Sequence, residues 1–218
     1  AFTQDEFLRL KAAADSGDLE LIQKLTSVVE KIDSAKLVIN WPDEAATIAA
    51  GLEKEALVTL EGDGGVIPKR VFEDMDRILG HLLRNSVDHG LEVPAEREEA
   101  GKPAMGSLRV KVDADDSQFQ FEIQDDGKGI DFDQLAETAA FNDRLDQALV
   151  EKYVAAGEQW RILFMAGFST AEQVSEVSGR GIGLSAVKTV IDSYGGTIQI
   201  ESVLGQGTTF RVKIPIKE

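Results

Sequence analysis

The chain has 218 residues, no cysteine and 20 glycines, and its 23 basic and 39 acidic residues give a formal net charge of −16. This acidic excess argues against a nucleic-acid or anionic-membrane binder, because no basic surplus remains to neutralise phosphates, and the lack of cysteine excludes disulfides and thiol catalysis. Hydrophobic residues at 43% and charged residues at 28% are near globular averages, so we expect a real core.

The first 36 or so residues are predicted to form a short helical hairpin. A break at Ser16 and Gly17 separates its two helices, and Asp18 is expected to cap the second. Apolar residues then recur at helical spacing as far as Ile32, which predicts a stripe that packs on the main domain or on a second chain. We therefore treat residues 1–40 as a docking or dimerisation element and residues 41–218 as the main domain.

The main domain is predicted to begin with a helix at Trp41 and Pro42, because proline suits a first helical turn. A strand at 56–60, a long helix at about 68–89 and a polar loop at 91–106 follow. Alternating apolar residues within 108–123 then predict two antiparallel strands joined by a tight turn.

The second half of the domain repeats this alternation of helices and strands. Helical segments are expected across 133–165, followed by a mobile loop rich in Gly, Ser and Thr at 167–183. A helix at about 184–194 should stop at Gly195, and a hairpin around 204–207 closes the chain. This order predicts an α+β fold, a two-layer sandwich with helices on one face of a sheet.

Asp125 is the first candidate for chemistry. It continues the core-facing parity of the strand at 119–123, so its carboxylate is expected to point inward, where it needs hydrogen-bond donors. Gly127 and Gly129 follow, and they let a ligand approach the backbone. Asp125 either accepts from an N–H group of a ligand or caps the end of its strand.

The long helix carries the second candidate set. His81, Asn85 and Asp88 are spaced so that they share one helix face. An imidazole, an amide oxygen and a carboxylate there could hold a metal ion or position water and a hydroxyl group. The alternative is a face that is simply solvated.

A glycine-rich loop at 179–183, directly before a helix, is the third candidate. Free backbone N–H groups at a helix start, together with the helix dipole, bind phosphate. The loop is neither a P-loop nor a dinucleotide fingerprint, because it lacks the closing Gly-Lys-Ser/Thr and follows no strand. Taken together, the three sets suit a nucleotide: Asp125 for the base, Asn85 for Mg²⁺ and the loop for the phosphates.

In these residues the sequence resembles the ATP-binding domain of the GHKL superfamily, which includes histidine kinases, DNA gyrase and MutL. Within this superfamily it most resembles the chemotaxis-type histidine kinases. Five motifs occur in the family's order: residues 81–90 resemble the N box, 125–131 the G1 box, 164–170 the F box, 179–184 the G2 box and 205–208 the final Gly-x-Gly-Thr.

The resemblance implies a Bergerat-type fold that binds ATP and Mg²⁺. Asp125 would accept a hydrogen bond from the adenine amino group, with Thr208 helping through water, and Asn85 would ligate Mg²⁺. His81 and Asn85 would be the catalytic residues. The other nucleotide-binding positions that it implies are Arg84, Asp88, His89, Gly127, Gly129, Phe168, Ser169, Thr170, Gly179, Arg180, Gly181, Gly183 and Leu184.

The resemblance also implies a reaction, the transfer of the ATP γ-phosphoryl group to a histidine in two-component signalling. Both histidines of the chain, His81 and His89, lie in the N box, so the acceptor is expected on a separate phosphotransfer domain or chain, which passes the phosphoryl group to a response regulator. The alternatives are a GHKL-type ATPase and a nucleotide-binding module without kinase activity.

The net charge and the family resemblance together predict the compartment and the partners of the protein. We expect a cytoplasmic protein with no nucleic acid partner and no direct membrane contact, and a homodimer contact is a candidate role for the N-terminal helices. Because the acidic surface would repel anionic partners, the acceptor domain is expected to dock through shape or a local basic patch such as Arg84, Lys102 and Lys128.

Overall fold

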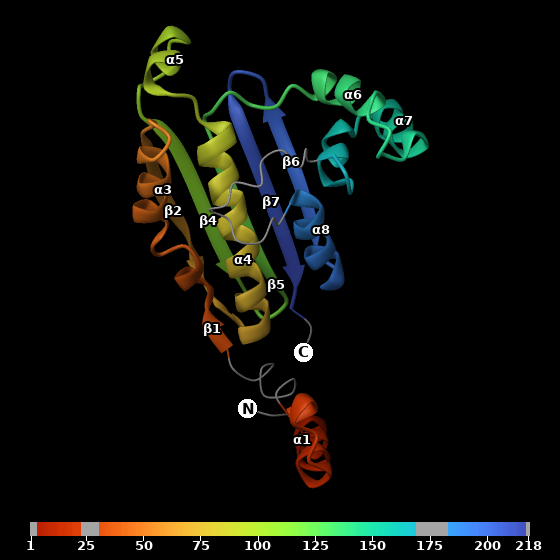
Figure 1. The fold of residues 1–218 in the computed structure, drawn as a ribbon. Helices are drawn as coiled ribbons and strands as arrows, with labels where there is room; N and C mark the ends of the chain where they lie inside the picture. The colour runs from red at the N-terminus through yellow and green to blue at the C-terminus, as the bar shows by residue number, and fades with distance from the viewer. Residues whose placement is uncertain (1–3, 23–30, 169–182, 217–218) are drawn as a thin grey trace.

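The computed structural model describes residues 4–22, 31–168 and 183–216 (Figure 1). Its elements in chain order are α1 (Gln4–Ser16), β1 (Lys31–Asp33), η1 (Ser34–Leu37), α3 (Trp41–Ala50), β2 (Ala56–Gly64), β3 (Val66–Pro68), α4 (Lys69–Asn85), η2 (Ser86–Gly90), α5 (Pro94–Glu99), β4 (Gly106–Ala114), β5 (Gln118–Asp125), α6 (Phe132–Ala140), α7 (Gln147–Ala155), η3 (Gln159–Phe164), α8 (Leu184–Ser193), β6 (Thr197–Val203) and β7 (Gly207–Pro215).

Within these residues, one sheet has the strand order β2-β4-β5-β7-β6. The hairpins β4–β5 and β6–β7 are antiparallel, as the alternating apolar residues predicted. Strand β2 lies parallel to β4, because the chain crosses over through α4 before it returns to the sheet. Helices α3, α4 and α8 lie across one face (Figure 1), so the predicted two-layer α+β architecture is confirmed.

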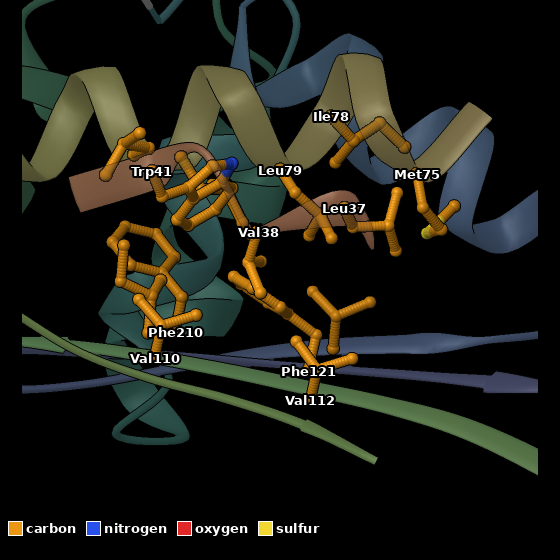
Figure 2. Packing of buried hydrophobic residues seen from close by; sticks show 14 of the residues in the cluster. Leu37, Val38, Trp41, Met75, Ile78, Leu79, Val110, Val112, Phe121 and Phe210 are labelled. Atoms are coloured by element: carbon orange, nitrogen blue, oxygen red, sulfur yellow. The ribbon is translucent and has the colours of Figure 1, made fainter. Parts of the chain in front are cut away.

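The core lies between this helical layer and the inward face of the sheet (Figure 2). Trp41 of α3 meets Phe121 of β5 edge to face, with ring centroids 5.6 Å apart, and Leu79 of α4 is fully buried in the same cluster. Truncating a buried aromatic such as Phe121 to alanine typically costs about 3–5 kcal/mol. Through Leu79 this cluster packs α4 against the sheet.

The N-terminal prediction is partly wrong. Asp18 does cap a helical turn, since its carboxylate accepts from the Leu21 N–H at 2.9 Å, but the predicted helix does not continue to residue 36. Ile32 instead lies in β1, opposite Ile67 of β3. Residues 34–38 then turn inward and bury Leu37 in the core. The division at residue 40 stays a prediction.

Other departures concern segment ends. The long helix stops being α-helical at Asn85, and the predicted polar loop at 91–106 contains α5. Gly195 has a φ of 67°, the left-handed conformation predicted for the stop of α8. Most of the predicted mobile loop lies outside the described residues. Among the described residues, no helix is long and apolar enough to cross a membrane.

Candidate functional site

A cavity of about 540 Å³ opens where the end of α4 meets the end of β5, helix α6, the start of α8 and the β6–β7 turn. This volume lies in the range of small-ligand pockets. One wall belongs to the main core. The opposite wall, formed by α6 with α7 and η3, has a small hydrophobic cluster of its own around Leu135 and Ile162. Residues Ile130 and Leu163 pack against both clusters.

Asp125 lies in this cavity as the last residue of β5 and is 3% exposed. Its Oδ1 accepts from the backbone N–H groups of Gly127 at 3.0 Å and Thr208 at 3.1 Å. Burial raises the pKa of the carboxyl to about 6, although these N–H groups act in the opposite direction. A buried acceptor is therefore held ready beside the cavity.

Ser86 adds a second buried polar group to the same pocket. It is 2% exposed and lines the cavity, and its hydroxyl has no partner with hydrogen-bond geometry among the described residues. An unpaired buried hydroxyl is costly unless a ligand or water satisfies it. Ser86 carries no distinctive sequence signal beyond its place next to Asn85.

Gly127 is required for the close approach of two segments behind Asp125. A Cβ at this position would lie 2.1 Å from the carbonyl oxygen of Gly90, which is far below van der Waals contact. The neighbouring Lys128 N–H donates to the same carbonyl at 2.9 Å. The turn after β5 is therefore held directly against the end of η2.

Asn85 ends α4, and a single π-helical turn, η2, follows it. The Leu91 N–H closes that turn on the Ser86 carbonyl at 2.9 Å, and such turns are common at functional sites. The ammonium group of Lys54 donates to the carbonyls of Val87, at 3.1 Å, and Asp88. Burial lowers the pKa of Lys54, with Asp88 opposing the shift and Lys128 adding to it.

His81 orients the Asn85 side chain. The Asn85 amide nitrogen lies 3.1 Å from His81 Nε2. Burial, followed by the neighbouring His89 and Arg84, lowers the pKa of His81, so the imidazole is neutral at pH 7 and its Nε2 can accept from the amide. This arrangement leaves the Asn85 carbonyl oxygen for another ligand.

The start of α8 forms the remaining described wall. Gly183 is extended at the N-cap position and Leu184 lines the cavity, as does Phe168. Backbone N–H groups of a first helical turn favour anions. The predicted positions Ser169, Thr170, Gly179, Arg180 and Gly181 lie outside the described residues.

The structure brings seven of the twelve described predicted positions together. Those that line the cavity are Asn85, His89, Asp125, Gly129, Phe168, Leu184 and Thr208. The five that are not among the lining residues are His81, Arg84, Asp88, Gly127 and Gly183. Lining residues that sequence reasoning did not single out are Ser86, Gly90, Ile130, Asp131, Gln134, Leu135, Thr138, Leu163, Leu204 and Phe210. Helix α6 supplies three of these, and its amphipathic spacing was the available signal.

One of the three members of the expected basic docking patch is not a free surface charge. Lys128 is exposed and lines the cavity, and docking through Arg84 and Lys128 stays a prediction. Lys102 has a side chain only 16% exposed, and its ammonium group is bonded to Glu92 and to two backbone carbonyls. Local hydrogen bonding, which composition does not reveal, therefore engages the charge of Lys102.

Asn85 fits Mg²⁺ only as one ligand among several. Within the described part of the chain, no group of three or more His, Asp or Glu side chains could hold a metal ion. An amide oxygen with phosphate oxygens and water is a usual environment for Mg²⁺, which seldom has a cage made only of protein. The residues present therefore fit a metal that arrives with a nucleotide.

The family described as "Histidine kinase-, DNA gyrase B-, and HSP90-like ATPase" matches residues 71–218. The gliding motility regulatory protein of Myxococcus xanthus is 33% identical over 218 residues, covering 97% of this chain and 28% of the relative. Chemotaxis protein CheA of Salmonella typhimurium is 36% identical over 177 residues, 81% of this chain and 26% of the relative.

The chain thus spans about a quarter of the length of these relatives. Among solved structures, a histidine kinase domain from the Erythrobacter litoralis EL346 blue-light activated histidine kinase is similar with a TM-score of 0.47 and 14% identity, over 84% of this chain and 60% of that one.

Proposed function

Since the chain belongs to the family of histidine kinase-, DNA gyrase B- and HSP90-like ATPases, we propose that it is the catalytic domain of a chemotaxis-type protein-histidine kinase. Its relatives, which include CheA proteins, identify it as a kinase-type ATPase domain. The proposal adds the reaction: transfer of the ATP γ-phosphoryl group to a histidine on a separate phosphotransfer domain or chain. A response regulator is then the final acceptor, and the setting is cytoplasmic.

One observation carries the proposal: the inward carboxylate of Asp125 and the amide of Asn85, our proposed Mg²⁺ ligand, line the same cavity. A nucleotide has a base at one end and a phosphate chain at the other, and a cavity that binds it needs a different polar group at each end. Asp125 would accept from the adenine amino group, with Thr208 beside it. The unpaired Ser86 hydroxyl would face the same end of the ligand.

The other end of the cavity would hold the phosphates. Bound Mg²⁺ would neutralise phosphate charge there, and the Asn85 carbonyl oxygen is its ligand in the proposal. Lys128 and the first turn of α8 would add donors. Positions of the predicted mobile loop and of its glycine-rich end, including Ser169, Thr170 and Gly179 to Gly181, complete this end in the proposal.

The transfer itself needs positioning more than covalent chemistry. A neutral imidazole nitrogen of the acceptor forms a bond to the γ-phosphorus while the bond from that phosphorus to the β–γ bridging oxygen breaks, so that ADP leaves. The other ring nitrogen then loses its proton to water. His81 has its Nε2 engaged by Asn85, so it serves to orient Asn85. Arg84, Asp88 and His89 would act around the phosphates or at the acceptor.

A phosphotransfer assay tests the proposal. The domain is incubated with Mg²⁺, γ-labelled ATP and a panel of histidine-phosphotransfer domains from its own cell, and acid-labile phosphate on the acceptor is measured. We expect labelling of at least one acceptor. Rapid release of inorganic phosphate without any acceptor would favour the simple ATPase instead. Tight ATP binding with neither outcome would favour a non-catalytic nucleotide-binding module.

A further inference from the structure

The loop between η2 and β4 contains a buried charge cluster that the proposed function does not use. We define it as Glu92, Arg97 and Lys102 of this loop together with Asp126 of the turn after β5, whose side chain is 39% exposed. The Arg97 side chain is fully buried, and those of Glu92 and Lys102 are 12% and 16% exposed. Glu92 binds both cations, Lys102 at 2.7 Å and Arg97 at 3.1 Å. Buried charges are kept only where they are paired, so the cluster has a defined geometry.

The two cations of the cluster converge on the turn that follows β5. Arg97 binds the Asp126 carboxylate at 2.8 Å, and its second nitrogen lies 3.4 Å from the Asp126 carbonyl oxygen. Lys102 donates to the carbonyls of Asp126 at 3.0 Å and Gly127 at 2.7 Å. The other oxygen of the Asp126 carboxylate accepts from the Ser107 N–H at 2.9 Å. The turn is thus held from several sides.

A single peptide group joins this cluster to Asp125. The Asp126 carbonyl accepts from the two cations, and the N–H at the other end of the same peptide, on Gly127, donates to Asp125 Oδ1 at 3.0 Å. Cations on a carbonyl oxygen polarise the peptide and strengthen its N–H as a donor. Lys102 therefore acts on Asp125 without touching it.

The second donor to Asp125 provides an internal comparison. The Thr208 N–H also donates to Oδ1, at 3.1 Å, but the carbonyl of its peptide, on Gly207, accepts from the neutral hydroxyl of Ser202 at 2.9 Å. The two N–H groups that donate to Asp125 thus differ in what binds the carbonyl of their peptide, which is a pair of cations for Gly127 and a neutral hydroxyl for Thr208. Removing the charge of Lys102 should affect the Gly127 donor and leave the Thr208 donor unchanged.

We propose that Lys102, supported by Arg97 and Glu92, is a positioning residue for adenine recognition, because it sets the hydrogen bond between Gly127 and Asp125. The inference rests on the proposed binding of adenine at Asp125. It assigns the loop at 91–105 a role in base binding, at a distance from the phosphates and from the acceptor histidine.

The first test needs no nucleotide. In the ligand-free domain, Lys102→Met should move the Gly127 amide proton upfield in a ¹⁵N–¹H spectrum, since its hydrogen bond weakens, while the Thr208 amide stays in place. The matched control is Lys111→Met, which removes an exposed lysine paired with Asp113 at 2.9 Å on the sheet. An unmoved Gly127 amide, or equal movement of both amides, would overturn the inference.

The second test measures ligand affinity by calorimetry. Lys102→Met should weaken adenosine binding by roughly three- to tenfold and change Mg²⁺-pyrophosphate binding less than about twofold, because the loss is confined to the base end. Equal losses for both ligands would indicate a general structural defect. If the wild-type domain did not bind adenosine, the proposed function would fail, while the spectrum would still test the Lys102 effect on Gly127.

A milder variant covers the case in which Lys102→Met does not fold. Lys102→Gln keeps a neutral donor for the two carbonyls, so it should fold, and it should shift the Gly127 amide in the same direction. Lys102→Arg keeps the charge and should bind adenosine within about twofold of wild type. A Gln variant indistinguishable from wild type in both measurements would contradict a role for the charge.

Discussion

Burial of the ionised Asp125 side chain lowers the free energy of unfolding of the domain. The Asp125 pKa of about 6, raised mainly by burial, lies above the ordinary value of 3.8, and this difference corresponds to about 3 kcal/mol against the ionised form. The penalty is fully present above about pH 6. It disappears below about pH 4, where the carboxyl is protonated in both the folded and the unfolded chain.

Asp125→Asn should therefore stabilise the ligand-free domain while weakening nucleotide binding. An asparagine oxygen can still accept from Gly127 and Thr208, but its amide presents a donor where the adenine amino group needs an acceptor. We expect the free energy of unfolding at pH 7.5 to rise by about 1–3 kcal/mol, and this gain to vanish near pH 4. Urea titrations at both pH values, with an ATP titration at pH 7.5, measure this. A less stable variant, or one with wild-type ATP affinity, would contradict the assignment.

Asn85→Ala is expected to abolish phosphotransfer but to retain adenosine binding, because it removes the proposed Mg²⁺ ligand without touching Asp125. Losing a group that stabilises transferring phosphates typically costs about 10²–10³-fold in rate. Labelled phosphate on the acceptor and adenosine calorimetry are measured on the same preparation. Asn40→Ala, at an exposed asparagine before α3 that makes no capping bond, is the matched control. Phosphotransfer that persisted in Asn85→Ala would remove Asn85 from the site.

Some site residues could be predicted from the sequence because their signals are local. The inward direction of Asp125 follows from strand parity, and the shared face of His81 and Asn85 follows from helical spacing. Lys54 could not be found this way, since it lies more than 30 residues before the carbonyls that it contacts. Ser86 was missed because a serine in a helix has no distinctive pattern.

At the scale of elements, the end of α4 is the structurally unusual place. A helix end leaves carbonyls without partners and carries a partial negative charge, and here it lies beside a cavity proposed to bind phosphates. Lys54 donates to two of the carbonyls in η2. It therefore both satisfies the backbone and offsets the negative end of the helix.

Lys54→Met should loosen η2. We expect a loss of about 1–2 kcal/mol in the free energy of unfolding, since two buried carbonyls lose a charged donor, and weaker binding of ATP than of adenosine, because the lost charge lies toward the phosphates. Chemical denaturation and calorimetry with both ligands are the measurements. Lys213→Met, at an exposed strand position, is the control. Equal weakening of ATP and adenosine would argue against the electrostatic role.

The elements show the same limit of sequence reasoning as the residues. Both hairpins were predicted because strand alternation and turn residues are close together in the chain. Strand β1 was not, because Ile32 fits a helical stripe and is drawn into a strand only by its distant partner Ile67. Helix α5 was missed because its six residues are too few and too polar to show a period.

At the scale of the whole molecule, the net charge of −16 opposes the approach of ATP, although local donors favour its binding. Salt screens the long-range repulsion more than contacts inside the cavity. We therefore expect the association rate of ATP to rise by about two- to threefold between roughly 20 and 150 mM NaCl. Stopped-flow fluorescence with a labelled ATP analogue measures this rate. A falling rate would mean that cations such as Lys128 dominate the approach.

The two hydrophobic clusters that face each other across the cavity have a consequence for cooperativity. Among the described residues, two side chains, Ile130 and Leu163, pack against both clusters, while Phe164 ties η3 to the main one. We therefore expect α6 and α7 to open as a unit before the sheet does. A nucleotide held between the walls would act as a further link across this junction. Hydrogen exchange of residues 132–155 should then slow on ATP binding more than exchange in β4 and β5, and equal slowing would indicate that the domain opens as a single body.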